Sequence, residues 1–358
     1  MKELINSIRI FLIYRFYNIG VILERISNKG FALDIFSSSF QNNPYETYSR
    51  MRSINPIYHS KPTFLRWVTK MELVQEMIRD DRFSVDDRKF PIAKLRRNEL
   101  RRDGRDIMLD QFENPSILKL DPPDHSRIRK LVSYGFTNRY IKSLETEIND
   151  TINQCLDKTH NLESFDLMNV LAKPLPAIVI AKMMGLPDSD LNQFQTWSEN
   201  LLKEVGGIGS SVKKRKRARD AYEDLIRYFE KIIIERKDNP GDDFIGKLIL
   251  AEEEGDKLNV KEMYGTCLLL LIAGHETTTR LVGNGLFALL NHPDQFECLK
   301  DDHSKIPNAI EEMLRYEPPV HATVRFANEN MTYRNRDYKR GTPFALSLIH
   351  ISEPTRPY

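Results

Sequence analysis

The segment Cys267–Arg280 reads CLLLLIAGHETTTR, which places an acid and a row of hydroxyls inside an apolar helical pattern. Gly274 weakens a helix interior. Thr277 follows Ala273 by four residues, so its hydroxyl can bond the Ala273 carbonyl and open a local groove. An acid next to an alcohol at a weakened helix could deliver protons to a bound reactant. We therefore take Ala273, Gly274, Glu276 and Thr277 as candidate site residues.

Two better-known motifs do not fit the same helix. A zinc protease needs a second histidine at the fifth position of HExxH, where this chain has Thr279. The sequence GNGLFA at Gly283–Ala288 resembles part of a dinucleotide fingerprint, but it follows a helical pattern rather than a strand. Neither metal hydrolysis nor dinucleotide binding is therefore predicted here.

Three further sets of charged residues are weak signals when taken singly. Glu312 and Arg315 stand three residues apart, so on a helix they share one face and can pair. His125 and Arg129 stand four residues apart and also share a helical face. Arg325 adds a cation in a stretch that alternates like a strand.

Helices must position most of these residues. An apolar pattern of helical period runs from Val260 to Leu290, and a second helix over Ile306–Val320 is stopped by two prolines. A third helix begins in DPPDHSRIR, with Asp121 as its expected cap. Amphipathic segments near 139–158, 167–184, 190–204 and 212–237 also predict helices, whereas a hairpin is expected at 56–70 and short strands after 322. The predicted class is mostly α with a minor β portion.

Composition excludes several classes of protein. The chain has 358 residues and a net charge of +2, which gives no general attraction to nucleic acid. Its three cysteines, Cys155, Cys267 and Cys298, are too few and too scattered for a disulfide framework or a zinc site. A reducing, cytoplasmic compartment is the expectation.

The N-terminal residues 1–30 are predicted to form an extension ahead of the main domain. Arg9 and Arg15 interrupt its apolar stretch, so a membrane-spanning helix is not predicted. The extension is either a helix packed on the fold or an amphipathic helix that touches a membrane surface through residues 1–25. A basic run at 213–219 could contact an acidic surface, but a solvated helix face is the simpler interpretation.

The motifs NPYETY, RDDRFS, DPPDHSRIR, AGHETT and EEMLRYEPPV, in this order and followed by Arg325, resemble the cytochrome P-450 family of haem-thiolate monooxygenases. The resemblance is to the soluble bacterial type and covers about Asn42 to Phe344, within a domain placed at 31–345. It implies the cytochrome P-450 fold, a haem b cofactor, and insertion of one oxygen atom from dioxygen into a hydrophobic organic substrate. It also implies a monomer that receives electrons from NAD(P)H through a separate ferredoxin- or flavodoxin-type partner.

The resemblance also implies a role for each candidate residue. Ala273 and Gly274 match the family's oxygen-binding groove, Thr277 its hydrogen-bond donor to dioxygen, and Glu276 its proton relay. Two further groups of residues also match the family. The expected contacts to the haem propionates are His125, Arg129 and Arg325, and the expected buried structural pair is Glu312 and Arg315.

One departure from the family is decisive for chemistry. The family's axial cysteine lies in an F-x-x-G-x-x-x-C-x-G loop after the E-x-x-R pair, and this sequence has no such loop. Residues 346–358, LSLIHISEPTRPY, look like a translated sequencing adaptor, so we expect a domain truncated after residue 345, a non-native tail and an inactive chain. Two alternatives stay open, a peroxygenase of the same fold and a non-catalytic helical haem- or ligand-binding protein. The Glu276–Thr277 pair argues against the peroxygenase, because that relay serves dioxygen activation.

Overall fold

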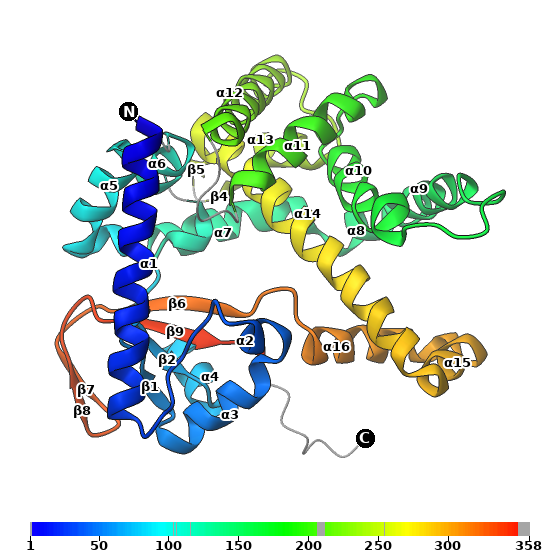
Figure 1. The fold of residues 1–358 in the computed structure, drawn as a ribbon. Coiled ribbons are helices and arrows are strands. Elements are labelled where there is room, and N and C mark those ends of the chain that lie inside the picture. Colours follow the sequence, from blue (N-terminus) through cyan, green and yellow to red (C-terminus); the bar gives the residue numbers. More distant parts are fainter. Residues whose placement is uncertain are drawn as a thin grey trace. The chain divides into compact units, whose positions relative to one another are not determined.

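The computed structural model describes residues 2–102, 104, 106–114, 116–205, 212–253 and 255–349 (Figure 1). The chain divides into two compact units. The first combines Met1–Glu99 with Glu311–Tyr358, and the second is the continuous segment Leu100–Ile310. No helix in the described part of the chain is long and apolar enough to cross a lipid bilayer.

The first unit is built on a mixed five-stranded sheet in the order β1-β2-β9-β6-β3. Its strands are β1 (Ile57–His59), β2 (Arg66–Val68), β3 (Phe83–Ser84), β6 (Ala322–Ala327) and β9 (Pro343–Ser347). The β1–β2 hairpin is antiparallel, as the sequence predicted. β9 pairs parallel with β2 and antiparallel with β6, so the last described strand lies at the centre of the sheet.

The C-terminal segment enters this sheet beyond the predicted domain boundary. β9 continues through Leu346 and Ser347, whose side chains are fully buried. The boundary expected after Ala345 therefore falls inside β9. Residues 350–358 of the expected non-native tail lie outside the described residues.

Helices and a second hairpin complete the first unit. The helices are α1 (Lys2–Ser27), α2 (Ser38–Asn42), α3 (Pro44–Ile54), α4 (Met71–Arg79), η1 (Asp87–Lys89), α5 (Ile92–Arg102) and α16 (Ile306–Tyr316). The last three residues of α5 and the first five of α16 belong to the second unit. The hairpin joins β7 (Met331–Tyr333) to β8 (Arg336–Tyr338). Two residues of α1 contact the turn of the β1–β2 hairpin. A Cβ at Gly20 would lie 3.0 Å from Pro62 Cα, and Glu24 Oε2 accepts from the Lys61 backbone amide at 2.6 Å.

The second unit is almost entirely helical. Its elements are α6 (Asp106–Glu113), η2 (Ile117–Lys119), α7 (Asp124–Ser133), η3 (Tyr134–Phe136), α8 (Asn138–Ser143), α9 (Glu145–Asp157), the π-helical η4 (Met168–Ala172), α10 (Pro174–Met183), η5 (Asp188–Asp190), α11 (Leu191–Val205), α12 (Val212–Glu235), α13 (Phe244–Leu250), β4 (Glu252–Glu253), β5 (Asp256–Lys257), α14 (Val260–Asn291), α15 (Pro293–Asp301) and η6 (His303–Lys305).

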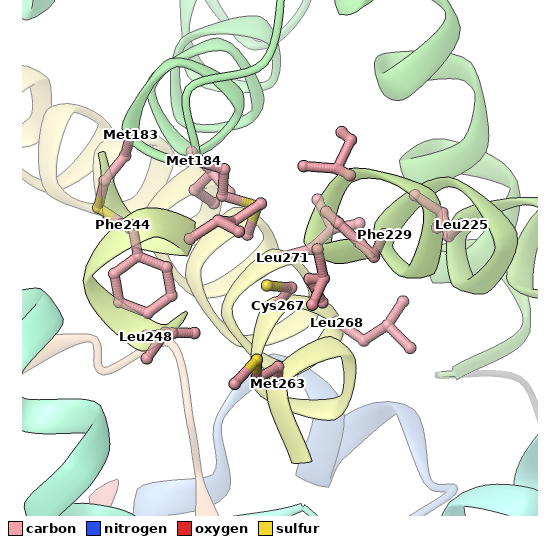
Figure 2. Close-up of a cluster of buried hydrophobic side chains, with 14 of the residues drawn as sticks. Met183, Met184, Leu225, Phe229, Phe244, Leu248, Met263, Cys267, Leu268 and Leu271 are labelled. Atoms are coloured by element: carbon pink, nitrogen blue, oxygen red, sulfur yellow. The ribbon is translucent and has the colours of Figure 1, made fainter. Parts of the chain in front are cut away.

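The central helix α14 begins where the sequence predicted and ends one residue later. Asn259 and Glu262 form a reciprocal capping box at its start. Every fourth residue of one face is buried and packs into the core of the unit, from Met263 through Cys267 to Leu271 (Figure 2). Side chains of α10, α12 and α13 complete this core, which the view shows closing around the sulfur of Cys267.

The helix that carries His125 and Arg129 begins later than predicted. α7 starts at Asp124 with Pro123 at the cap position, whereas Asp121 was the expected cap, and the Pro122–Pro123 peptide bond is cis. A residue that precedes proline is disfavoured in the α region, and both Asp121 and Pro122 precede one. The chain is therefore still extended or turning where the capping pattern favoured a helix start.

Candidate functional site

The groove-forming turn of α14 has the hydrogen bond that its spacing predicted. Thr277 Oγ1 donates to the Ala273 carbonyl oxygen at 2.5 Å. The same carbonyl is the normal acceptor for the backbone amide of residue 277 in an α-helix, so it serves two donors. Ala273 and Thr277 are both half-buried, which leaves this turn within reach of a small molecule.

Gly274 lies where α10 approaches α14. A Cβ added at Gly274 would lie 3.0 Å from Ile180 Cδ1 of α10. The small residue therefore permits a close helix–helix contact. That observation concerns packing, and the expected role of Gly274 in making room for dioxygen stays a prediction.

Glu276 is held by a cation on its own helix. Arg280 donates to Glu276 Oε1 from Nη2 at 2.6 Å and from Nε at 3.2 Å. The Glu276 side chain is 36% exposed and that of Arg280 58% exposed. An ion pair with this exposure contributes only a few tenths of a kcal/mol, so Glu276 can leave Arg280 at little cost.

His275 is a buried residue of this turn that the sequence analysis did not select. Its ring is 5% exposed, with Nδ1 2.7 Å from Ser198 Oγ of α11 and Nε2 3.0 Å from the Lys173 carbonyl oxygen. Burial lowers the pKa of the imidazole, against smaller opposing effects of the Lys173 carbonyl and of nearby carboxylates. The four-residue stripe through Leu271 continues to His275 and could have identified it as buried.

The three cations expected at haem propionates lie on two units. His125 is half-buried and Arg129 exposed, one turn apart on α7 as the spacing predicted. Arg325 lies on β6 in the other unit, where its Nη1 donates to the Val324 carbonyl at 3.1 Å and to Thr323 Oγ1 at 3.3 Å. The structure describes each set within its own unit, so their joint role stays a prediction.

Glu312 and Arg315 form the expected pair on α16. Arg315 Nε donates to Glu312 Oε2 at 2.6 Å, and Arg315 Nη2 contacts Glu312 Oε1, which makes the pair bidentate. The side chains are 26% exposed for Arg315 and 35% exposed for Glu312. The pair is therefore partly exposed rather than buried, contrary to the expectation, and the remaining water access weakens it.

The cysteines do not fit a haem ligand. Cys267 is fully buried among apolar side chains, and burial raises the pKa of its thiol to about 12, so it is not a thiolate at neutral pH (Figure 2). Cys155 is buried as well, and Cys298 is exposed with its Sγ 3.0 Å from Lys305 Nζ. No group of three metal-ligating side chains lies together within the described residues. Cys267, although it lies on the same helix as the candidate turn, is thus unsuited to supply the thiolate of a haem site.

Comparisons with known proteins identify the family. The family model described as Cytochrome P450 matches residues 92–355. Cytochrome P450 CYP107DY1 of Priestia megaterium is 34% identical over 288 residues, covering 79% of this chain and 69% of the relative. Polyketide biosynthesis cytochrome P450 PksS of Bacillus subtilis is 35% identical over 316 residues, covering 86% of this chain and 75% of the relative.

Solved structures agree with this assignment. The structure of PksS superposes with a TM-score of 0.77 at 32% identity, covering 89% of this chain and 78% of that one. The structure of CYP109E1 from Bacillus megaterium in complex with testosterone gives a TM-score of 0.74 at 32% identity, covering 86% of this chain and 76% of that one. Both neighbours share the mostly helical fold with a minor sheet. With the AGHETT turn, the E-x-x-R pair and these matches together, the chain belongs to the cytochrome P450 family.

Proposed function

We propose that this chain carries the oxygen-facing part of a haem-dependent monooxygenase site, which inserts one oxygen atom from dioxygen into a hydrophobic organic substrate. The acid–alcohol turn of α14 carries the proposal. Thr277 is back-bonded to Ala273 and Glu276 is held only by a weak exposed pair. Both groups can therefore change partners at low cost.

The two side chains would act on protons. Thr277 Oγ1 bonds a carbonyl that already has a backbone donor, so its hydroxyl proton can turn toward a bound reactant without leaving a buried acceptor unpaired. Arg280 occupies Oε1 of Glu276, so Oε2 is the atom at which a proton from solvent can be held and passed on. Haem, when bound, supplies the oxygen activation that neither side chain can perform.

The printed sequence does not supply the ligand that this chemistry needs. A haem thiolate favours O–O cleavage by donating electron density to iron. Cys155, Cys267 and Cys298 all lack the sequence context of such a ligand, and burial among apolar side chains keeps the thiol of Cys267 protonated. We therefore propose that the 358-residue chain by itself does not insert oxygen.

The partners follow from the family. The cofactor would be haem b, and electrons would pass from NAD(P)H through a separate ferredoxin- or flavodoxin-type protein to a monomer. PksS is named for polyketide biosynthesis, and CYP109E1 was solved in complex with testosterone. A hydrophobic small molecule is the corresponding proposal here.

Two other activities receive less support. A peroxygenase of the same fold takes oxygen from peroxide and does not need an acid–alcohol relay, which this chain retains at Glu276 and Thr277. The missing cysteine loop would support a non-catalytic helical haem- or ligand-binding protein only if the C-terminus of the chain is genuine. Its discriminating feature is the DNA that follows codon 345.

The proposed location is the cytoplasm, with α1 as the element that would touch a membrane surface. Phe16, Ile22 and Ile26 of α1 are 71%, 56% and 75% exposed, an unusual apolar outer face. Recovery of all the protein in the aqueous fraction, without detergent or added salt, would rule out this contact.

Sequencing the source locus outward from codon 340 tests the main proposal. A frame that continues into F-x-x-G-x-x-x-C-x-G would encode a longer protein, expected to bind haem and oxygenate a hydrophobic substrate.

In that longer protein, the Thr277→Val variant should consume NAD(P)H without forming an equivalent amount of oxygenated product, whereas Thr277→Ser should keep NAD(P)H consumption coupled to oxygenation. Turnover by the 358-residue chain itself would contradict the proposed inactivity.

A further inference from the structure

We infer that His275 is a positioning residue whose imidazole fixes α11 and the start of α10 against the turn of α14 that carries Glu276 and Thr277. The importance of that turn rests on the proposed function. The contacts themselves are properties of the described structure and can be tested without turnover.

The hydrogen bonds determine which tautomer is present. Nε2 faces the Lys173 carbonyl at 3.0 Å, which can only accept, so Nε2 carries the hydrogen. Nδ1 must then accept from the Ser198 hydroxyl at 2.7 Å. One neutral ring therefore joins three helical segments, and each of its nitrogens has a defined partner.

A buried serine next to a histidine also suggests a nucleophile with its base. Ser198 is 0% exposed and His275 5% exposed. A nucleophile must reach a substrate carbonyl, and this hydroxyl has no exposed surface. The Ser198–His275 pair therefore holds helices together and is not a hydrolytic site.

α11 is bound to α12 by other contacts. Trp197 Nε1 donates to Asp224 Oδ2 at 3.2 Å, and the rings of Phe194 and Phe229 pack edge to face at 6.3 Å. α11 and α12 should consequently move as a pair. Ser198 then ties that pair to α14 through His275, so a change at this ring shifts both helices relative to Glu276.

Protonation should weaken the tie. An imidazolium has two donors and no acceptor, so Ser198 would have to turn its hydroxyl away, and the charge would be buried. Two carboxylates of the elements packed around His275, Glu199 on α11 and Glu276 on α14, favour protonation of its ring. The third charged group is Lys173 at the junction of η4 and α10, whose Nζ donates to Asn169 Oδ1. Because the folded pKa is lowered from 6.5, the neutral tie is complete above that pH and is lost as the pH falls through the folded value.

Amide hydrogen exchange of the full chain can separate the two hydrogen bonds. Glutamine at position 275 can still donate to the Lys173 carbonyl but offers nothing at the Nδ1 position, whereas asparagine can accept from Ser198 but does not reach Lys173. We expect His275→Gln and Ser198→Ala each to lower the protection of α11 amides by roughly three- to tenfold, as for one lost buried hydrogen bond. His275→Asn should retain α11 protection and lower that of α10.

Three controls complete the test. The double variant should exchange like His275→Gln alone, because both changes remove the same bond. Amides of α13, which shares neither of the two described hydrogen bonds of the ring, should be unchanged in Ser198→Ala, so that global loosening can be recognised. After correction for intrinsic exchange, α11 protection should fall below about pH 6.5 in the wild type and not in His275→Gln.

The inference is overturned if α11 protection is the same in Ser198→Ala and the wild type, or if α13 loses as much protection as α11. Failure of the proposed oxygenation would leave these exchange patterns intact. An unchanged α11, conversely, would leave the oxygenase proposal standing. The two proposals are therefore separable.

Discussion

At the residue scale, three polar side chains within two turns of α14 meet their hydrogen-bonding needs in different ways. Thr277 bonds a backbone carbonyl of its own helix, and His275 bonds two other helical segments. Thr279 is 9% exposed, and its Oγ1 finds no partner among the described residues. The polar row HETTT thus includes one hydroxyl that is buried without compensation.

Thr279→Val should therefore stabilise the protein. Valine has nearly the same shape and removes a buried hydroxyl whose desolvation costs about 1–3 kcal/mol when unpaired. We expect the free energy of unfolding in urea to rise by about 0.5–1.5 kcal/mol. The matched control is Thr151→Val, because Thr151 is also buried, at 1% exposed, but donates to the Glu147 carbonyl at 2.7 Å, and the loss of that bond should destabilise the protein. Stabilisation by both variants would mean that hydrophobicity alone explains the effect.

The sequence predicted the local contacts of this turn and missed the distant ones. The Thr277–Ala273 bond follows from a spacing of four residues, and so does the Glu276–Arg280 pair. Ser198 and Lys173 lie 77 and 102 residues from His275, and no local pattern pairs residues at such separations. The sequence analysis therefore selected Glu276 as a candidate and not its neighbour His275, although His275 is the more buried of the two.

At the element scale, the glycines of α14 differ in what surrounds them. A Cβ at Gly265 would meet no atom within 4 Å, whereas one at Gly283 would lie 2.7 Å from Met168 Sδ. Gly265→Ala should raise the free energy of unfolding by about 0.5–1 kcal/mol through helix propensity alone. Gly283→Ala gains the same propensity but must displace Met168, so we expect no net gain. Thermal and urea unfolding of the two variants side by side checks this, and an equal gain in both would contradict the close approach of η4 to α14.

Glu24 anchors α1 to the rest of its unit. The fully buried carboxylate accepts from the backbone amides of Leu33 at 3.0 Å and Lys61 at 2.6 Å, and from the Tyr58 hydroxyl. Burial and Glu24 both raise the pKa of Tyr58, so this phenol stays protonated and donates at any ordinary pH.

Glu24→Gln should be costly although the side chain keeps its shape. The amide retains one acceptor oxygen, and its NH2 group would face a donor. We expect the free energy of unfolding of this unit to fall by about 2–3 kcal/mol. Unfolding would be monitored by the fluorescence of Trp67 in a Trp197→Phe background. Tyr58→Phe removes one donor to Glu24 and the acceptor of Asn28 Nδ2, leaves both backbone donors in place, and should cost less, about 1 kcal/mol. An equal loss in both variants would show that the amide donors contribute nothing.

Element boundaries were predictable where a period persists and unpredictable where partners are remote. The α14 pattern continues over eight turns and gave its limits within one residue, whereas the start of α7 was misplaced because consecutive prolines overrode a cap signal. The hairpin at 56–70 and the strands after 322 were recognisable, whereas β3, β4 and β5 were not predicted and the order of the strands was not predictable. β2 and β9 are parallel neighbours although some 280 residues separate them, and alternation indicates a strand without naming its partner.

At the scale of the whole molecule, the two units have separate hydrophobic cores. The large core around α14 draws all its buried residues from positions 120–271, inside the second unit. Two smaller cores draw theirs from positions 31–83 and 327–349, inside the first unit. A continuous segment with its own core can fold alone, whereas a discontinuous unit needs both of its chain segments.

Two shortened chains test this organisation. A chain ending after Ile349 retains β9 and every described pairing, so its unfolding should match that of the full chain. A chain ending after Gly341 loses the central strand β9, so β2 and β6 no longer share a neighbour. Trp67 also loses Ala345, its partner in the β2–β9 register, and becomes exposed. We expect Trp67 to be exposed to quenchers from the outset in the shorter chain. Trp197 of the second unit should still report a cooperative transition.

The two tryptophans make the readout specific, because the chain has no others. Single-tryptophan backgrounds, Trp67→Phe and Trp197→Phe, assign each signal to one unit. If Trp197 loses its transition together with Trp67, the second unit depends on the first and its core is not self-sufficient. If Trp67 stays protected without β9, the first unit does not need its central strand, and the proposed dependence of this unit on both chain segments is contradicted. The predicted result would show that residues 343–347 stabilise the first unit alone. The α14 turn of the second unit would then stay folded in both shortened chains.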